Sequence, residues 1–389
     1  MIRTRTLIAV AVAVALVLGL FVAGVALLAF RHSVGIALAP VATAVVRAKA
    51  NRDVSAAFGK HRLNVLILGN QGEEGTSDTI ILSHLDLDRH TATLVSIPRD
   101  AWVTVAHHGS MKLNSVIGVG GAKLTAGVVS ALTGATIDAA MVVSPEGAKQ
   151  LVDGLGGVNI DVEKDMDYDD NYGDLHIHLK KGEQFLSGGQ VLGYMRFRHD
   201  DEGDFGRMRR QQQVVRQIAH DMAQPAQWAK LPRLVALARK DVRTGLNDKQ
   251  LTALVETYRS VGQDDLRTLT LPASYGWVGE ASVVFIDPRW ARFVGRILCS
   301  PRTPPQDVVL VANATGLTDV DKVIVGALRG GGWNVQTFVD VPTVFASEIV
   351  GSSPTAARLG HVFRIVKRRP GRQTVLKLGS DLRPGASAR

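Results

Sequence analysis

The 389-residue chain has very little cysteine. Its single cysteine, Cys299, excludes an intrachain disulfide, and its apolar surroundings predict a buried side chain. Histidine and cysteine are not spaced as zinc ligands, and no helix-turn-helix pattern is present. The acidic segment 163–174 lacks the regular ligand spacing and terminal glutamate of an EF-hand. These absences argue against a disulfide scaffold, a zinc module, a calcium loop and a DNA reader.

Two histidines, His176 and His178, alternate in a predicted strand directly after the acidic segment. Alternation places both imidazoles on one face of the strand. A metal site needs at least one further ligand, and the sequence does not supply an obvious one. The pattern therefore favours a solvent-facing strand surface.

Positive charge exceeds negative charge along the chain. Lysine and arginine number 45 against 36 aspartate and glutamate, which gives a formal net charge of +9. This balance favours anionic partners such as membrane surfaces, phosphorylated lipids, cell-wall polymers or nucleic acid. Charge alone does not choose among them.

Residues 7–30 form one uninterrupted uncharged run. As a helix the run would be about 36 Å long, enough to cross a hydrocarbon core of about 30 Å. The nearby basic residues, Arg3, Arg5, Arg31 and His32, favour a cytoplasmic N-terminus and an extracellular location for the bulk of the chain. A signal peptide cleaved near residues 37–39 is the alternative, but the run exceeds the usual 7–15 residues. A retained single-pass anchor is favoured, which argues against nucleic acid as a partner.

Beyond the run, strand patterns alternate with amphipathic helical patterns. They predict an α/β fold with a central mixed β-sheet flanked by helices, followed by a small α/β domain. The predicted division is a cytoplasmic tip and transmembrane helix (1–32), a stalk (33–62), a main domain (63–300), a proline-bearing linker (301–306), a C-terminal domain (307–382) and a disordered tail (383–389).

Polar residues follow or precede the predicted strands of the main domain. Asp78 opens the second strand and Arg99 follows the third, so both lie at strand ends, where sites in such sheets are common. A lone residue of this kind is usually a cap or a surface charge. Lys112 and Asn114 precede a helical pattern, and the pattern over 137–162 predicts a strand, a helix and a strand in one βαβ unit.

The stretch 194–213 contains five arginines and four carboxylates. A strand over 192–198 would place Arg196 and Arg198 on the same face as Tyr194. A helix capped by Asp204 would then carry a polar stripe, formed by Arg207, Arg210 and Gln211.

Guanidinium groups bind phosphate oxygens bidentately, and several gathered together repel one another unless an anion joins them. The stretch therefore predicts an anion clamp. The alternative is a salt-bridged surface, because acidic residues 200–202 lie within the same stretch.

Several motifs occur in the order found in a known family. They are SDTI from Ser77, LVSIPRD from Leu94, KLN from Lys112, LVDGLGGV from Leu151 and RFRHDDEGDFGRMRRQQ from Arg196. With these motifs the chain resembles the LytR-CpsA-Psr family of membrane-anchored cell-wall phosphotransferases. The module that ends in LKLGSD resembles the C-terminal domain often fused to such proteins.

The resemblance implies transfer of a glycopolymer phosphate from a polyprenyl-pyrophosphate carrier to a peptidoglycan hydroxyl. Asp78 matches the magnesium ligand of the family, so Mg²⁺ is the implied cofactor. A carboxylate near Asp204 would serve as general base. The helix after Asn114 and the strand 137–143 are the candidates for an apolar slot around the lipid. The other residues implied to contact the pyrophosphate are Arg99, Arg196, Arg198, Arg207, Lys112, Asn114, Arg210 and Gln211.

Two positions depart from the family pattern. Gln71 stands where the family usually has a second magnesium-binding aspartate, and Thr76 stands where it usually has an arginine. A neutral amide is a poor Mg²⁺ ligand beside a carboxylate. Because of these departures, an alternative function is a non-catalytic, membrane-anchored binder or scaffold for lipid-linked glycans or wall polymer. A membrane-bound transcriptional attenuator is disfavoured by the predicted topology.

Overall fold

The computed structural model describes residues 52–70, 75–171, 175–197, 203–223, 230–261, 265–299, 308–315, 320–331, 333–337, 342–365 and 367–382. The predicted transmembrane helix, the linker and the tail lie outside this part of the chain, as do Gln71 and Arg198.

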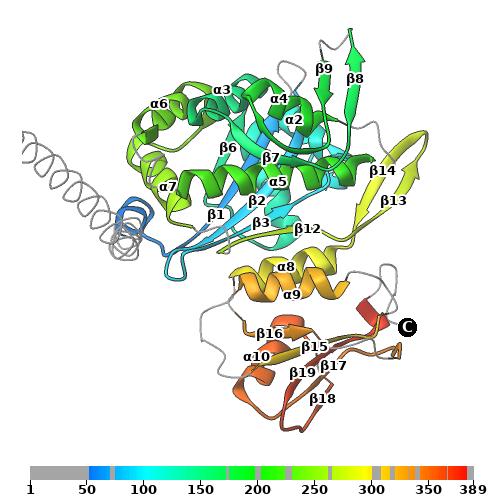
Figure 1. Cartoon of the computed structure of the whole chain (residues 1–389). Coiled ribbons are helices and arrows are strands. Elements are labelled where there is room, and N and C mark those ends of the chain that lie inside the picture. Colours follow the sequence, from blue (N-terminus) through cyan, green and yellow to red (C-terminus); the bar gives the residue numbers. More distant parts are fainter. Residues whose placement is uncertain are drawn as a thin grey trace, which may run out of the picture.

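A six-stranded mixed sheet forms the centre of the molecule, as predicted, with strand order β11-β6-β1-β2-β3-β12 (Figure 1). β2 pairs antiparallel with β1 and β3, whereas β6 pairs parallel with β1 and β12 parallel with β3. The strands are β1 (Arg62–Asn70), β2 (Ser77–Asp86), β3 (Thr91–Ser96), β6 (Ala139–Val143), β11 (Val242–Thr244) and β12 (Leu266–Thr270).

Helices cover both faces of this sheet because alternate strand residues are buried on opposite sides. Leu66 and Leu82 belong to the core that also contains buried residues of α2, α8 and α9. Val65 and Ile81 belong to a second core together with residues of α7. These helices and α5, whose Val215 packs against the second core, are α2 (Val116–Thr133), α5 (Gly203–Ala223), α7 (Asp248–Ser260), α8 (Pro288–Cys299) and α9 (Val320–Gly330).

The C-terminal module contains a five-stranded sheet of order β16-β15-β19-β17-β18. Its buried side chains continue the core of the main domain, and the rings of Phe293 on α8 and Phe363 on α10 lie 5.1 Å apart. Helices α8 and α9 therefore lie between the two sheets (Figure 1). The elements are β15 (Val309–Asn313), β16 (Val335–Thr337), β17 (Glu348–Val350), α10 (Pro354–Phe363), β18 (Arg368–Arg369), β19 (Thr374–Leu378) and η5 (Ser380–Leu382).

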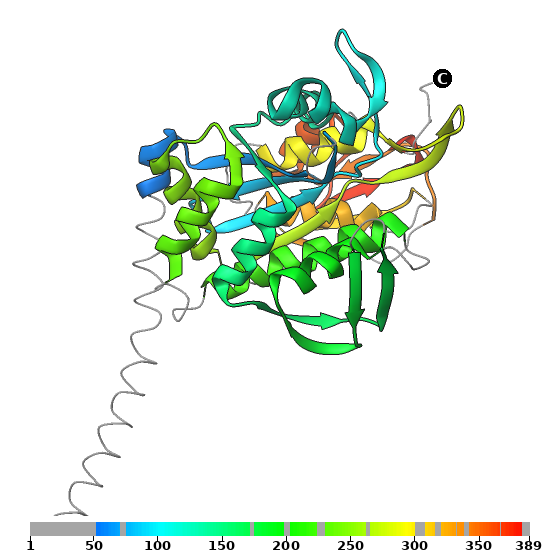
Figure 2. The ribbon, with the colours of Figure 1, turned by 90° about the horizontal axis from the view of Figure 1, so that it is seen from above.

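Four two-stranded sheets lie around the main sheet. They are β4 (Trp102–Val105) with β5 (Gly109–Lys112), β7 (Val158–Val162) with β10 (Gly182–Leu186), β8 (Met166–Asp170) with β9 (Leu175–Leu179), and β13 (Ala273–Val278) with β14 (Ala281–Ile286). Helix 52–58 and the β13–β14 hairpin lie at opposite ends of the molecule in both views (Figure 2). The remaining helices are η2 (Leu113–Ser115), α3 (Pro145–Leu155), α4 (Gly188–Arg196) and α6 (Leu231–Asp241).

Three predictions about local structure are wrong. The pattern over 137–162 does not form a βαβ unit, because β7 pairs with β10 and not with a strand of the main sheet. The predicted strand 192–198 is largely helix α4, which begins at a capping box between Ser187 and Gln190. Cys299 is exposed at the end of α8, where its Sγ accepts a hydrogen bond from Asn64.

Within the described residues, one helix, Leu113–Thr133, is apolar and long enough to cross a membrane by length and composition. It is distinct from the predicted anchor at residues 7–30. Buried residues of this helix, including Val116 and Val129, belong to the core between the sheet and α8. Its place in that core accounts for its apolar composition.

Candidate functional site

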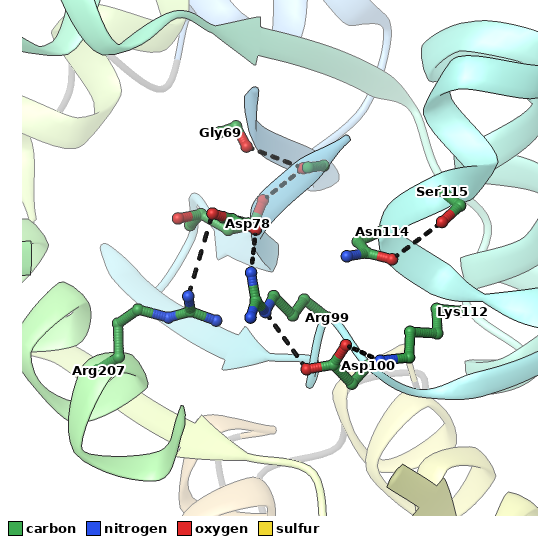
Figure 3. Close-up of polar contacts among 10 residues, drawn as sticks. Gly69, Asp78, Arg99, Asp100, Lys112, Asn114, Ser115 and Arg207 are labelled. Carbon is green, nitrogen blue, oxygen red and sulfur yellow. Dashed lines mark hydrogen bonds and ion pairs between the residues drawn. The ribbon is translucent and has the colours of Figure 1, made fainter. Parts of the chain in front are cut away.

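The antiparallel pairing of β2 and β3 brings Asp78 and Arg99 together. Ile81 is the register partner of Ser96, so the start of β2 lies beside the residues that follow β3. Arg99 Nη1 donates a hydrogen bond to Asp78 Oδ1 over 2.5 Å (Figure 3). Both side chains are largely buried, with 17% and 12% of their surfaces exposed. The predicted strand-end position of these two residues is thereby confirmed.

Helix α5 brings Arg207 toward the same carboxylate. Arg207 Nη1 lies 4.0 Å from Asp78 Oδ2, and the Arg207 side chain is only 5% exposed (Figure 3). Gln211, one turn further along α5, lines the same small cavity of about 10 Å³ as Asp78, Arg99 and Arg207. We call these four residues the strand-end site. Two guanidinium groups thus approach the Asp78 carboxylate, and we expect phosphate oxygens to be suitable ligands for them.

The loop after β3 is held to the segment that precedes α2. Leu113 N donates to Ala101 O at 2.8 Å, and Asn114 N donates to Arg99 O at 2.9 Å. Asp100 lies 3.3 Å from Arg99 Nε and 2.9 Å from Lys112 Nζ. Lys112 and Asn114 therefore lie beside the strand-end site, as Figure 3 shows. Sequence reasoning did not select Asp100, whose carboxylate positions both cations.

Gln212, which the sequence analysis also did not select, fixes α5 over the strand ends. Its Nε2 donates to Ser96 Oγ at 2.8 Å, to Thr270 Oγ1 at 3.1 Å and to Leu269 O at 3.1 Å. These acceptors belong to β3 and β12, next to the loop that carries Arg99. The side-chain amide of Gln212 thus holds the following turn of the helix against β3 and β12, which helps to fix the position of Arg207 relative to Asp78.

Arg210 is enclosed elsewhere, in what we call the Glu163 cluster. Its side chain is 0% exposed, and its Nη1 donates to Glu163 Oε1 at 3.1 Å. Arg210 Nη2 donates to Phe197 O at 2.6 Å, and Tyr194 Oη donates to Glu163 Oε2 at 2.8 Å. Arg210 therefore connects α5 to the end of α4 and to the segment that joins β7 and β8.

The Glu163 cluster perturbs the pKa of two of its members. Burial acts to raise the pKa of Glu163, but hydrogen bonds from its own backbone, Tyr194 and Arg210 outweigh burial and lower that pKa. Burial first, and then the hydrogen bond to Glu163, raise the pKa of Tyr194. Glu163 is thus held as a carboxylate and Tyr194 as a neutral phenol, which is the pairing expected of a structural contact.

Arg196 is not among the described residues that line the strand-end cavity. Arg196 is the last residue of α4, two positions after Tyr194. Two residues of a helix are about 200° apart around its axis, so Arg196 and Tyr194 do not share a face as the strand prediction required. Arg198 lies outside the described residues. The first turn of α5 includes Asp204, but the position of its side chain is not described.

The histidines of the β8–β9 hairpin face acidic residues on the neighbouring strand. His176 Nδ1 lies 2.5 Å from Asp169 Oδ1, and His178 Nδ1 lies 2.5 Å from Asp167 Oδ1. All four side chains are substantially exposed, which confirms the predicted solvent-facing surface. The acidic segment contributes a strand here and does not form a calcium loop over its described residues.

A larger cavity of about 980 Å³ lies between α2, β6 and β11. Its lining combines apolar side chains, such as Ile117, Ala126 and Val142, with Lys123 and Arg243. Helix α2 is kinked at Gly120 and Gly121, and Gly121 has a φ of 66° that favours glycine. The cavity reaches Asn70, the register partner of Ser77, and so lies one residue from Asp78 along the strands.

The residues beside Asp78 fit a magnesium ion only when a ligand supplies further oxygens. Among the described residues no group of three or more His, Cys, Asp or Glu side chains is arranged to hold a metal. Asp78 offers one carboxylate, and the buried Oδ1 of nearby Asn70 has no hydrogen-bond partner in the described structure. Mg²⁺ commonly combines one or two carboxylates with water and substrate phosphates, so this donor set suits shared coordination.

The fold and the strand-end site together define a layered α/β protein in which Arg99 and Arg207 meet Asp78 in a largely buried position at the ends of two central strands. Residues 37–291 match the LytR_cpsA_psr family, which covers more than half of the chain. The chain therefore belongs to the LytR_cpsA_psr family, as its motifs predicted.

Among the similar proteins, some are named as regulatory proteins and others as transferases. The chain is 33% identical over 216 residues to the regulatory protein MsrR of Staphylococcus aureus, covering 54% of this chain and 64% of MsrR. It is 29% identical over 239 residues to the polyisoprenyl-teichoic acid–peptidoglycan teichoic acid transferase TagV of Bacillus subtilis, covering 59% of this chain and 61% of TagV. The match thus spans less than two thirds of the length of these curated relatives.

The fold also resembles that of a solved relative. The crystal structure of Bacillus subtilis TagV superposes with a TM-score of 0.55 and 28% identity. That match covers 61% of this chain and 96% of the TagV chain in the crystal.

Proposed function

We propose that this protein transfers a glycopolymer phosphate from a polyprenyl-pyrophosphate carrier to a hydroxyl of peptidoglycan. The observation that carries the proposal is the strand-end site, in which Arg99 and Arg207 converge on Asp78 in a largely buried cavity. The name of the relative TagV supports a lipid-linked donor and a peptidoglycan acceptor. The product would be a phosphodiester link in the cell wall.

In the proposed reaction the acceptor hydroxyl oxygen attacks the phosphorus attached to the glycan. A new bond forms between that oxygen and phosphorus, and the bond from phosphorus to the bridging oxygen breaks. The polyprenyl phosphate leaves with the electron pair of the broken bond. The hydroxyl proton passes to a base, for which a carboxylate near Asp204 remains our candidate.

The arginines would stabilise charge on the reacting phosphates. Phosphoryl transfer depends mainly on positioning and on electrostatic stabilisation of the transition state. Arg99 and Arg207 approach the site from a loop and a helix, and Lys112 is held beside them by Asp100. Donors fixed on three different segments can surround a pyrophosphate without reorganising during the reaction. Gln211 would donate to a remaining oxygen.

Asp78, with Asn70 beside it, would hold Mg²⁺ together with the substrate. When bound there, the ion would neutralise negative charge on the pyrophosphate. Binding of substrate would weaken the contact between Arg99 and Asp78, because the pyrophosphate would compete for the guanidinium. The donor set therefore predicts that Mg²⁺ binds more tightly with the pyrophosphate than alone.

The cavity between α2 and β6 is our candidate for the polyprenyl chain. Its volume of about 980 Å³ lies near the upper end of common ligand cavities. The helix after Asn114 and the strand 137–143 are also the elements that the sequence offers for an apolar slot. We also propose that residues 7–30 anchor the protein in the membrane with the N-terminus in the cytoplasm, which would place this cavity in reach of a lipid carrier.

A direct test uses the full-length protein in detergent with a lipid-linked pyrophosphate glycan, peptidoglycan fragments and Mg²⁺. The proposal predicts a phosphodiester product and an equal amount of released polyprenyl phosphate. Binding of the carrier without either product would contradict it and would favour a non-catalytic binder. Two observations support that alternative. The relative MsrR is named a regulatory protein, and the neutral residue Thr76 stands where the family usually has an arginine.

A further inference from the structure

The β13–β14 hairpin exposes an unusual amount of apolar surface. Tyr275 is 59% exposed, Trp277 71%, Phe285 40% and Val278 37%. Half of the large hydrophobic side chains found exposed in the described residues lie in this hairpin. Exposed apolar side chains that lie next to one another commonly mark a binding surface, whereas single exposed apolar residues do not.

The hairpin is attached directly to the strand-end site. Val284 N donates to Asp100 O at 2.9 Å, and Ala101 forms a parallel bridge with Val284. Tyr275 and Val284 line the same cavity as Asp78, Arg99 and Arg207. The backbone of the hairpin therefore has a fixed position relative to the proposed reacting phosphate.

One face of the hairpin leads outward from that cavity. Tyr275 and Trp277 lie two residues apart on β13 and so share a face, opposite Val284 and Ser282 on β14. Phe285 lies on the other face, where its ring covers Gly276 so closely that a Cβ on Gly276 would be 2.6 Å from Cε2. The pair of Tyr275 and Trp277 thus forms a separate aromatic surface that begins at the cavity and ends in solvent.

The charge of the hairpin argues against a membrane as the ligand of this surface. Residues 273–286 contain one charged side chain, Glu280, and contain neither lysine nor arginine. Segments that bind anionic lipid surfaces normally carry basic residues beside their apolar ones. In addition, helix 52–58, which follows the predicted anchor, lies at the opposite end of the molecule (Figures 1 and 2).

A neutral sugar suits the surface better. The C–H groups on one face of a pyranose ring stack on an aromatic ring, while its hydroxyls remain available for hydrogen bonds. Tyrosine and tryptophan combine a large flat apolar surface with a polar group, and Ser282 adds a hydroxyl on the same face. The cavity end of the surface meets the arginines that would hold the donor phosphate, so a sugar on it would have a hydroxyl near that phosphate.

We propose that Tyr275 and Trp277 bind sugar rings of the acceptor glycan and determine how its hydroxyl meets the donor. This inference rests on the proposed function for the identity of the glycan, which is peptidoglycan. The two aromatic residues bind and position the acceptor, and they take no part in bond formation.

The first experiment measures binding of full-length protein in detergent to purified peptidoglycan sacculi by cosedimentation, without any donor. Trp277→Ala is expected to weaken binding about tenfold, and Trp277→Phe to retain most of it, because the phenyl ring still stacks. Trp277→Leu should weaken binding as much as Trp277→Ala, since leucine is apolar but has no aromatic face. Phe345→Ala is the matched control, because Phe345 is 70% exposed in the C-terminal module.

Equal binding by the wild type and Trp277→Leu would overturn the proposal. A second outcome would also overturn it: Trp277→Ala no longer associates with anionic phospholipid vesicles, whereas Trp277→Leu still does. That result would identify a membrane-binding hairpin. In the transfer assay, Trp277→Ala should raise the acceptor KM about tenfold and change kcat little. Aromatic-dependent binding to sacculi without any transfer would refute the proposed function alone, whereas transfer with an unchanged KM would refute this inference alone.

Discussion

Arg207 and Arg210 lie three residues apart on α5, but they belong to different parts of the molecule. Arg207 faces Asp78 at 4.0 Å in the strand-end site, where a second arginine already contacts that carboxylate at 2.5 Å. Arg210 contacts Glu163 at 3.1 Å and the carbonyl of Phe197 at 2.6 Å, in a cluster that Tyr194 completes. On one helix, the same residue type therefore faces the proposed substrate site in one place and holds secondary structure together in the other.

This comparison separates function from stability. Among the described residues around Asp78, the cations Arg99, Arg207 and Lys112 outnumber the carboxylates Asp78 and Asp100, so we expect an anionic ligand to be favourable there. In the Glu163 cluster Arg209 and Arg210 both contact Glu163, and Arg210 also donates to the carbonyl of Phe197, so the cluster is held together by contacts within the protein. Mutations in the first should mainly affect activity, and mutations in the second should mainly affect the free energy of unfolding.

The largest expected effect is on transfer in Arg207→Met, which keeps an apolar stem and removes the charge. Loss of one fixed donor to the transition state typically lowers kcat by about 10²–10³-fold. The melting temperature should change little. Steady-state transfer assays and thermal unfolding of the same preparation check both statements. If Arg207→Met lost both its fold and its activity, the proposed difference between Arg207 and Arg210 would be contradicted.

The matched variant Arg210→Met should mainly lose stability. Removing Arg210 deletes its buried hydrogen bonds to Glu163 and to the carbonyl of Phe197, while Arg209 and Tyr194 still contact Glu163, so we expect a cost of about 2 kcal/mol. Activity per folded molecule should stay within about threefold of wild type, which is about 0.7 kcal/mol. Chemical denaturation measures the first quantity, and transfer normalised to folded protein measures the second. A loss of kcat as large as that of Arg207→Met would place Arg210 in the reaction.

A smaller effect is expected from adding groups to the strand-end site. The double substitution Gln71→Asp and Thr76→Arg supplies the carboxylate and the arginine that the family pattern usually contains. We expect Mg²⁺-dependent transfer to rise about tenfold, because a second carboxylate strengthens Mg²⁺ binding and an arginine adds a phosphate contact. The measurement is the initial rate against Mg²⁺ concentration. An unchanged rate would show that neither Gln71 nor Thr76 limits the rate of transfer.

The smallest expected effect concerns pH and the Glu163 cluster. The pKa of Glu163 is lower in the folded protein than its ordinary value, so its contribution to stability is present above that ordinary value. The contribution is lost as pH falls through the lowered folded pKa. When the pH is lowered from about 5 to about 3, the melting temperature of the wild type should therefore fall more than that of Glu163→Gln. Parallel pH dependences for the two proteins would contradict this assignment.

Much of the strand-end site could be predicted from the sequence because it depends on local patterns. The strands that carry Asp78 and Arg99 are short apolar runs with clear ends, and antiparallel pairing of neighbours brings those ends together. The spacing of Arg207 and Gln211 predicted a shared helical stripe, and both residues line the cavity. Local periodicity was sufficient for these positions.

Other features required tertiary contacts that the sequence does not encode locally. Arg210 fits the same helical stripe as Arg207, and its direction is decided by Glu163, a residue 47 positions away. Residues 192–198 alternate like a strand, but the capping box at Ser187 begins a helix that includes most of them. Tyr275 reaches the cavity from β13, which the sequence analysis did not predict as a strand at all.

Calorimetric titration of a polyprenyl pyrophosphate into the wild type, Arg207→Met and Arg210→Met tests the central claim most directly. The account predicts that Arg210→Met binds as the wild type does, whereas Arg207→Met binds at least about tenfold more weakly, since one charge-assisted phosphate contact is lost. Equal affinity of Arg207→Met and the wild type would contradict the assignment of the strand-end site to the pyrophosphate.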